Sequence, residues 1–299
     1  MRERPPHVAD ADLLAEVRRS WEPGVDRVAH LPVGFGAHHW AAYVAGSPRL
    51  FVTYDQGDPA ALADLEAAYA GAVALRESGL GFVLAPTRAR SGGLTVAFAG
   101  GALSCSPWRD GTSGAPLDVA WTSAALARLH ATAPPAGIPA WSPKVAPDFA
   151  DATERLLETP WGPGPFAGPA HDAVRRHLGD LERWTARYHH LGELARSRPW
   201  VAAHGEPHAA NQLLTDEGRL LVDWDTLRLA PAELDLRVLV GAGAVPEEVG
   251  ADAEMLELFD LQWRLDEISQ YAAWFAAPHH GTADDEIAFG GLRDELTRP

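Results

Sequence analysis

The most informative stretch of the sequence reads HGEPHAANQLLTDEGRLLVDWD, residues 204–225. A carboxylate, Glu206, precedes Asn211 by five residues, on a segment whose glycine and proline predict a loop. An apolar run then leads to a second carboxylate, Asp223, twelve residues after the asparagine. Phosphoryl transfer needs such a set: one carboxylate to orient a hydroxyl group, and an amide oxygen and a carboxylate to hold magnesium. The alternative is a solvated polar loop beside a buried strand.

Other chemistries fit this stretch less well. His204 and His208 are four residues apart, as in a zinc-binding helix, but Gly205 and Pro207 disfavour a helix there. Zinc deaminases also carry a histidine two residues before a glutamate, but they need a downstream pair of cysteines, and Cys105 is the only cysteine. We therefore expect His204 to hold the loop in place rather than to act as an acid or a base.

The composition is that of a globular chain of 299 residues, with 46% hydrophobic and 22% charged side chains. Acidic residues outnumber basic ones, 41 to 25, and the net charge of -16 makes nucleic acid and anionic membranes poor partners. No apolar run approaches the roughly 20 residues of a membrane-spanning helix, and no secretory signal is visible. We expect a cytoplasmic protein of two domains, or one large domain, that binds neither nucleic acid nor membrane.

Hydrophobic periodicity and turn residues predict a strand-rich first half and a mainly helical second half. Strands are expected at 25–33, 38–44, 49–54, 82–84, 94–98 and 103–106, and short strands around a loop at 201–214 and 219–223. Helices are expected at 10–21, 59–78, 118–131, 148–157 and 251–276, and one or two helices at 170–196. Asp58 can cap the helix at 59–78, and Gly79 can end it.

Taken together, these motifs resemble the aminoglycoside phosphotransferase family, on the protein-kinase-like fold, and its spectinomycin phosphotransferase branch most of all. The family's catalytic pattern, HGD followed by four residues and N, corresponds to residues 204–211. Its IDWD strand and the later P and DL residues correspond to 222–225 and 230–236. Its LxxLH helix corresponds to 126–130, and its glycine-bearing hairpin to Gly34-Phe35-Gly36.

The resemblance implies an α+β, two-lobed fold. The N-lobe, residues 1–104, would hold a small antiparallel sheet with one main helix and bind the nucleotide. A hinge at 105–108 would lead to a larger, mostly helical C-lobe, residues 109–299, with the catalytic loop and the acceptor site. The implied function is phosphorylation of a hydroxyl group on a small antibiotic-like molecule, such as an aminoglycoside or an aminocyclitol, with ATP or GTP and Mg²⁺ as cofactors.

The family's functional residues can be carried over one by one. Glu206 corresponds to the catalytic residue, and Asn211 and Asp223 correspond to the Mg²⁺ ligands. Asp225 could assist them, because on a strand it would share a face with Asp223. The positions that would meet the nucleotide are Gly34, Gly36, Thr53, Glu66 and, in the hinge, Ser106. The candidate walls of the acceptor site are the loop 160–169 and the acidic residues Asp260, Asp266 and Glu267, which could equally be a solvated helix face.

Two positions depart from the family pattern. Glu206 replaces the catalytic aspartate with a side chain that is one methylene longer. Thr53 stands where the family has the lysine that grips the nucleotide phosphates, and the single lysine, Lys144, lies far into the second half. We expect an arginine, backbone amides near Gly36 or Mg²⁺ alone to bind the phosphates instead.

The missing lysine also affects Glu66, which corresponds to its acidic partner in the family. We expect Glu66 to pair with Arg88 or Arg90, or to turn toward solvent, because an unpaired buried carboxylate is costly. The same departures leave a second function open: a degenerate kinase-fold protein that binds a small molecule or a partner with little or no transferase activity. The retained Asn211 and Asp223 argue against that function.

Overall fold

A computed structural model describes residues 3–34, 36–114 and 116–298, so Phe35 of the glycine hairpin lies outside the described residues. The chain forms two compact units. One contains Met1–Trp141 and Trp200–Val245, and the other contains Ser142–Pro199 and Pro246–Pro299. All the described strands belong to the first unit, and the second unit is helical in its described part.

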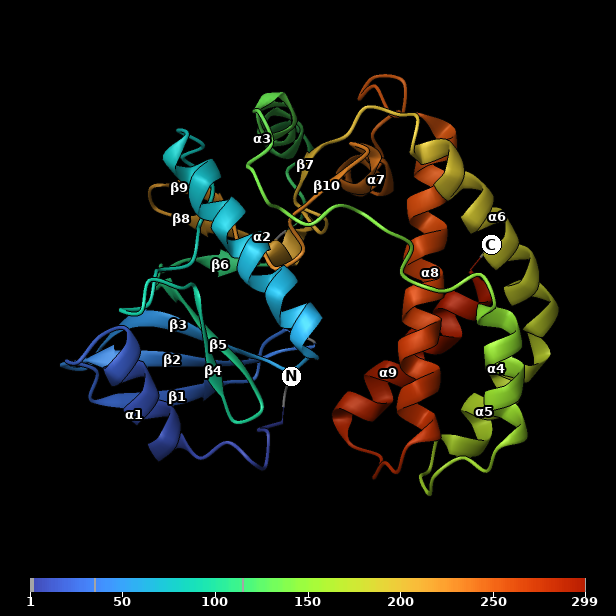
Figure 1. Ribbon diagram of the computed structural model, residues 1–299, viewed down its shortest axis with the longest axis horizontal. Helices are drawn as coiled ribbons and strands as arrows, with labels where there is room; N and C mark the ends of the chain where they lie inside the picture. Colours follow the sequence, from blue (N-terminus) through green and yellow to red (C-terminus); the bar gives the residue numbers. More distant parts are fainter. Residues whose placement is uncertain (1–2, 35, 115, 299) are drawn as a thin grey trace. The chain divides into compact units, whose positions relative to one another are not determined.

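A five-stranded antiparallel sheet forms the first part of the first unit (Figure 1). Its strands follow the order β1-β2-β3-β5-β4. Their bounds are β1 Arg27–Leu31, β2 His38–Val44, β3 Ser47–Asp55, β4 Thr95–Phe98 and β5 Gly101–Pro107. The strands confirm five of the six predictions for this half of the chain. The predicted strand at 82–84 is instead a single bridge, in which Val83 pairs with Leu221.

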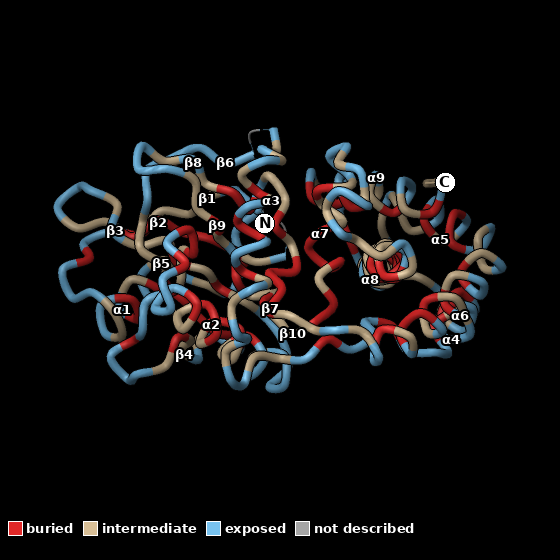
Figure 2. Tube along the Cα trace, turned by 90° about the horizontal axis from the view of Figure 1, so that it is seen from above, coloured by how far each residue is buried: buried red, intermediate tan, exposed pale blue. Residues whose placement is uncertain are grey.

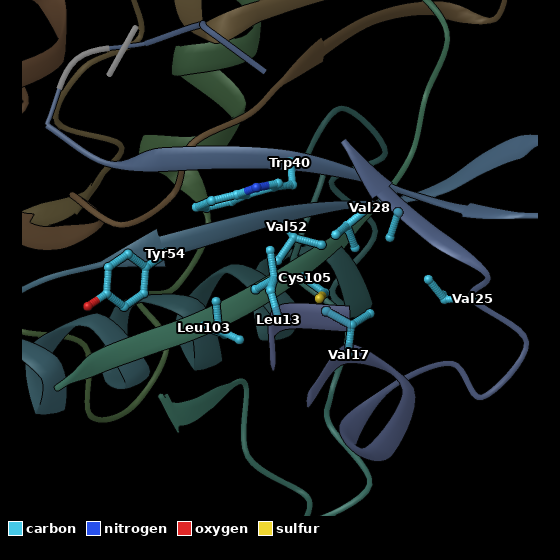
Figure 3. Packing of buried hydrophobic residues seen from close by; sticks show 10 residues of the cluster. Leu13, Val17, Val25, Val28, Trp40, Val52, Tyr54, Leu103 and Cys105 are labelled. Atoms are coloured by element: carbon cyan, nitrogen blue, oxygen red, sulfur yellow. The ribbon is translucent and has the colours of Figure 1, made fainter. Parts of the chain in front are cut away.

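One face of this sheet packs against helix α1 (Asp10–Ser20) in a hydrophobic core. Leu13 and Val17 of α1 point toward Val52 and Cys105 of the sheet (Figure 3). Because alternate residues of a strand point to opposite faces, Thr53 and Asp55 lie on the second face, whereas Val52 belongs to the core. This second face carries the residues that the sequence assigns to the nucleotide.

Helix α2 (Pro59–Glu77) contacts the second face of the sheet. It begins as the sequence predicts: the Asp58 carboxylate accepts hydrogen bonds of 2.9 Å from the backbone N–H groups of Ala60 and Ala61. The hydroxyl of Ser104 on β5 lies 3.5 Å from the hydroxyl of Tyr69 on α2. This contact places α2 beside Ser104, the residue that pairs with Thr53 on the neighbouring strand.

The rest of the first unit contains the stretch from which the fold was predicted. Its elements are β6 Thr112–Ser113, α3 Val119–Ala131, β7 Val201–Ala203, the 3-10 turn Ala209–Asn211, β8 Gln212–Thr215, β9 Gly218–Leu221, β10 Arg228–Ala230 and α7 Glu233–Gly241. Strands β8 and β9 form a hairpin. Leu221, at its end, accepts a 3.0 Å hydrogen bond from Leu84 N and donates a 2.8 Å bond to Phe82 O. These bonds hold the residues before Asp223 against the segment that follows α2.

The second unit is a bundle of helices: α4 Phe149–Glu158, α5 Ala167–Arg176, α6 Leu178–Ala195, α8 Ala253–Ala276 and α9 Ala283–Thr297. Buried residues recur along the length of α8. This helix packs against α5, α6 and α9, which lie around it in Figure 2. Of the one or two helices predicted at 170–196, the structure has two, which meet at His177. Helices α7 and α9 were not predicted. Among the described residues, no helix combines the length and apolar character that a membrane span requires.

Candidate active site

A buried carboxylate, Asp235 at the start of α7, organises the loop that bears Glu206. Its Oδ2 accepts hydrogen bonds of 2.9 Å from His204 N and from His130 Nε2 of α3, and its Oδ1 accepts one of 2.7 Å from Gly205 N. Burial alone would raise the pKa of Asp235, but the hydrogen bond and charge of His130, with the other donors, lower it. An ionised Asp235 therefore ties the loop to two helices.

His204 has the structural role expected from the sequence. Its buried ring donates from Nε2 to Val222 O at 2.9 Å and accepts at Nδ1 from Glu206 N at 3.3 Å. The ring also packs on Trp224, with 4.4 Å between the ring centroids. Burial lowers the pKa of His204, so the ring stays neutral and keeps this one arrangement of donor and acceptor. The loop bearing Glu206 is thereby joined to the segment bearing Asp223.

Gly205 is required at the turn before Glu206. Its φ of +97° lies in the left-handed region, and a Cβ at this position would lie 2.8 Å from Thr226 Oγ1 and 2.9 Å from Thr226 Cβ. The Thr226 hydroxyl in turn donates to His204 O at 2.7 Å. The close approach of Thr226 to residues 204 and 205 therefore fixes the backbone before Glu206, and with it the direction of the Glu206 side chain.

Glu206 itself is partly accessible, with 35% of its side chain exposed. Burial would raise its pKa, but His208, whose Nε2 lies 3.6 Å from Glu206 Oε2, and Arg237 outweigh that effect and lower the pKa. Glu206 is therefore ionised at neutral pH. A carboxylate of lowered pKa is a weak base but a good hydrogen-bond acceptor, so it is suited to orient a hydroxyl group.

Asn211 and Asp223 lie on either side of the base of the β8–β9 hairpin. The Asn211 side chain donates from Nδ2 to Glu206 O at 3.0 Å, which leaves Oδ1 as the amide atom that can ligate a cation. The backbone O of Asn211 accepts a 3.0 Å hydrogen bond from Val222 N. These two hydrogen bonds connect the Glu206 backbone, Asn211 and the residue before Asp223.

The expectation that Asp223 and Asp225 share a strand face is wrong. Strand β9 ends at Leu221, and Asp223 has a φ of +65°, in the left-handed region that non-glycine residues seldom adopt. Left-handed backbone interrupts the two-residue alternation of a strand. The two carboxylates nevertheless interact, since a hydrogen bond from Asp225 partly offsets the rise in the pKa of Asp223.

Asp55, at the end of β3, is a site residue that the sequence analysis missed. Burial and the negative charge of Asp225 raise the pKa of Asp55 to about 7, and its buried Oδ2 has no hydrogen-bond partner among the described residues. The surrounding protein atoms, which displace water from the carboxylate, and the charges of Glu206 and Asp55 raise the pKa of Asp223 to about 6. The residue as a whole is exposed, so water screens part of this effect. Burial and both Asp223 and Glu206 raise the pKa of Asp225. Asp55, Glu206, Asp223 and Asp225 are hence a group of mutually repelling carboxylates, called the carboxylate group below.

The carboxylate group predicts a pH-dependent stability. A folded-state pKa of about 7 at Asp55 exceeds the unfolded value, so the folded protein binds more protons and loses stability as the pH rises from about 4 to about 7. We expect Asp55→Asn, without added metal, to be more stable than the parent by about 1–3 kcal/mol at pH 8 and nearly equal to it at pH 4. Thermal melts across this range test the prediction, with exposed Asp64→Asn as control. A difference that does not grow with pH would contradict it.

The donor set fits Mg²⁺. Within residues 3–34, 36–114 and 116–298, no group of three or more His, Cys, Asp or Glu side chains is placed to hold a metal ion. Mg²⁺ at phosphoryl-transfer sites, however, needs only one or two protein oxygens, because phosphates and water complete its shell. Asn211 Oδ1 and the Asp223 carboxylate are such oxygens. A bound cation would also reduce the electrostatic repulsion within the carboxylate group.

The positions assigned to the nucleotide lie on the second face of the sheet and the turn beside it. Gly34 and Gly36 both have positive φ, of 72° and 92°. Thr53 pairs with Ser104 on one side and with His39 on the other. Ser106 pairs with Phe51 inside strand β5, near its end.

The expected pairing of Glu66 with Arg88 or Arg90, or its exposure to solvent, is wrong. Glu66 Oε1 accepts a 2.8 Å hydrogen bond from Leu94 N. Its Oε2 accepts bonds of 2.6 Å from Thr95 N and from Thr95 Oγ1. The start of β4 supplies these donors, so the Glu66 carboxylate needs no cation. Arg88 instead donates to Gly92 O at 3.1 Å.

The acceptor-site candidates Asp260, Asp266 and Glu267 all lie on α8, in the second unit. Asp260 forms an ion pair with Arg298, and Asp266 lies 3.9 Å from Lys144 Nζ. Glu267 hydrogen-bonds Tyr271 and contributes to the raised pKa of that tyrosine. The loop expected at 160–169 is shorter, because α5 already begins at Ala167. All three carboxylates therefore have partners within their own unit.

The role of Asp235 can be tested by stability. Asp235→Ala would leave the buried N–H groups of His204 and Gly205, and His130 Nε2, without their acceptor. We expect a loss of about 3–5 kcal/mol in the free energy of unfolding, and a smaller loss for Asp235→Asn, which keeps one acceptor. Chemical denaturation measures both. A loss below about 1 kcal/mol for Asp235→Ala would contradict the role of this carboxylate.

Comparison with solved structures supports the fold. A spectinomycin phosphotransferase crystallised with ADP and spectinomycin has a TM-score of 0.73 at 16% identity, over 99% of this chain and 96% of that one. An aminoglycoside phosphotransferase crystallised with AMP-PNP and hygromycin B has a TM-score of 0.53 at 12% identity, over 97% and 98% of the two chains. The prediction of an α+β, protein-kinase-like fold is confirmed.

Comparison of sequences identifies the family. Protein StrN of Streptomyces griseus is 31% identical over 253 residues, which cover 78% of this chain and 77% of that protein. Residues 36–274, from the second hairpin glycine to near the end of α8, match the model of the phosphotransferase enzyme family. This span includes the loop of Glu206, the hairpin between Asn211 and Asp223, and the anchoring Asp235. The chain belongs to the phosphotransferase enzyme family.

Proposed function

We propose that the protein transfers the γ-phosphoryl group of ATP or GTP to a hydroxyl group of a small, antibiotic-like molecule, with Mg²⁺. One observation carries this proposal: Glu206, Asn211 and Asp223 belong to a single hydrogen-bonded framework that also meets Asp235. A solvated loop would need no such framework. The nucleotide complexes of the spectinomycin phosphotransferase and of the aminoglycoside phosphotransferase crystallised with hygromycin B support the same nucleotide chemistry here.

Each residue has a distinct task in the proposed reaction. Glu206 accepts a hydrogen bond from the acceptor hydroxyl and aligns its oxygen with the γ-phosphorus. As the new P–O bond forms, the bond to the β-phosphate oxygen breaks, the nucleoside diphosphate leaves, and the hydroxyl proton passes to Glu206 or to water. Asn211 and Asp223 would hold Mg²⁺, which neutralises charge on the phosphates when bound.

The remaining assignments complete the proposal. Residues 1–104 serve as the nucleotide-binding lobe, 105–108 as the hinge that meets the base through its backbone, and 109–299 as the lobe of the catalytic loop and the acceptor. The acidic helix α8, with Asp260, Asp266 and Glu267, is proposed to attract a cationic acceptor. An aminoglycoside or aminocyclitol has such a charge. The relatives crystallised with spectinomycin and hygromycin B support this class of acceptor.

A mass-spectrometric screen tests the proposed function. The protein is incubated with Mg-ATP or Mg-GTP and a panel of hydroxylated aminoglycosides and aminocyclitols, and each product is examined for the mass of one added phosphoryl group. A thermal shift with each nucleotide, with and without Mg²⁺, accompanies it. A nucleotide at 100 times its Kd stabilises the fold by about 2.7 kcal/mol. No shift with any nucleotide would favour a binding protein without transferase activity.

A further inference from the structure

We propose that His39 binds the nucleotide phosphates in place of the missing lysine, with Thr53 as the residue that orients its ring. This inference rests on the proposed function, because it names a phosphate contact of the same nucleotide site. The donor is the Nε2–H group of a neutral imidazole, and the ligand is the phosphate chain of a nucleoside di- or triphosphate.

The positions of His39 and Thr53 suggest that His39 replaces the lysine. Kinases cover the phosphates with the pattern GxGxxGxV and grip them with a lysine on the third strand. In this chain Gly34 and Gly36 take the first two glycine positions, and His39 takes the third. Thr53 takes the lysine position. The strand register places His39 of β2 directly opposite Thr53 of β3, so the two departures from the pattern face each other across one ladder.

The geometry aims the ring at the glycine turn. His39 Nδ1 lies 3.2 Å from Thr53 Oγ1, and the ring packs on Phe51 with 4.9 Å between centroids. His39 is buried, with 8% of its surface exposed. Its other nitrogen faces the turn, since a Cβ at Gly34 would lie only 2.9 Å from Nε2. Any side chain at residue 34 would therefore meet the Nε2 end of the ring.

The ring acts as a neutral donor. Burial, together with the nearby His38 and His30, lowers the pKa of His39 to about 4, so the imidazole carries a single N–H at neutral pH. If the Thr53 hydroxyl donates to Nδ1, that hydrogen must reside on Nε2, the atom that faces the turn. Thr53 is thus a positioning residue, which selects the tautomer able to donate to a phosphate oxygen.

The environment of Glu66 agrees with a neutral group at this site. A lysine between the phosphates and α2 would be held by the acidic partner on that helix. Here Glu66 is committed to the backbone and side-chain donors at the start of β4. A neutral imidazole needs no counter-ion. The absence of the lysine is therefore consistent with a Glu66 carboxylate that binds the start of β4 instead.

Substitutions that separate the two ring nitrogens test the inference. Glutamine places an N–H near the position of Nε2, whereas asparagine reaches only the position of Nδ1. The Kd values of Mg-ATP and of adenosine, which lacks phosphates, are measured by calorimetry for the wild type, His39→Ala, His39→Gln, His39→Asn and Thr53→Val. Thermal melts confirm that each variant is folded.

We expect His39→Ala and His39→Asn to weaken Mg-ATP binding by about 10- to 100-fold, the range of a hydrogen bond to a charged group, with adenosine binding unchanged. His39→Gln should recover most of the affinity, and Thr53→Val should weaken it by a smaller factor. The double variant His39→Gly/Thr53→Lys, which restores the kinase pattern, should also bind Mg-ATP more tightly than His39→Gly alone.

Two results would overturn the inference while leaving the proposed function intact. One is a wild type that binds Mg-ATP and transfers phosphate, with His39→Ala and His39→Asn equal to it. The other is an equal loss of adenosine and Mg-ATP binding in both variants, which would show a packing role only. A folded wild type that binds no Mg-nucleotide would instead overturn the proposed function and this inference together.

Discussion

Asp223→Ala is expected to reduce phosphoryl transfer by more than about 10³-fold, because it removes the carboxylate proposed to hold Mg²⁺ at the site of charge development. The fold should survive. Asp223 is exposed and lies in the carboxylate group, so its removal relieves repulsion on Asp55 and Asp225. The measurements are turnover with Mg-ATP and a thermal melt, in which the midpoint should stay equal or rise at pH 7.

Asp216→Ala provides a matched control for this experiment. Asp216 is an exposed aspartate in the turn of the same β8–β9 hairpin. Its substitution removes one negative charge at the opposite end of the hairpin from Asn211 and Asp223. Its turnover should equal that of the parent. If Asp223→Ala retained full turnover while folded, the assignment of Asp223 as a metal ligand would be wrong.

Glu206→Gln is expected to lower turnover by about 10²- to 10⁴-fold, with little change in nucleotide affinity. The amide keeps the size of the side chain but loses the negative charge that attracts and orients the acceptor hydroxyl group. Steady-state turnover and the Kd of Mg-ATP measure the two effects separately. A Glu206→Gln variant as active as the parent would remove the catalytic role of this residue.

Glu206→Asp tests whether the site has adapted to the longer side chain. The backbone around Glu206 is fixed by the left-handed Gly205, by the bond from Glu206 N to His204 and by the bond from Asn211 to Glu206 O. A shorter carboxylate on this fixed backbone would fall short of the hydroxyl, so turnover should decrease, because reacting groups must be placed closely. An increase in turnover would show instead that the family's aspartate is the better residue here.

Much of the fold follows from local sequence signals. The extended segments of β2 and β3 and the Asp58 cap of α2 are encoded within a few residues, and the structure has them where they were predicted. Helix α7 was not predicted, because its decisive residue, Asp235, is polar and is buried only through its bonds to His204 and His130. Polar burial of this kind depends on distant segments.

In the candidate site, too, residues identified by local spacing were predicted, and residues that depend on distant segments were missed. Spacing along the chain identified Glu206, Asn211 and Asp223, which lie within one short stretch. Asp55 and His39 were missed, because each acquires its role from a partner on another segment: Asp225 for the former, and Thr53 across the β2–β3 ladder for the latter. The left-handed backbone of Asp223 was missed as well, since an apolar run before an aspartate reads as a continuing strand.

The three hydrogen bonds that Glu66 accepts from Leu94 and Thr95 bear on regulation. In protein kinases, movement of the corresponding helix breaks its ion pair with the lysine and switches the enzyme off. Here a swing of α2 would break bonds worth about 1.5 kcal/mol or more each, so a displaced helix would be populated in fewer than about one molecule in 10³. We expect this protein to lack that conformational switch and to be constitutively assembled, so that its activity in a cell follows the amount synthesised.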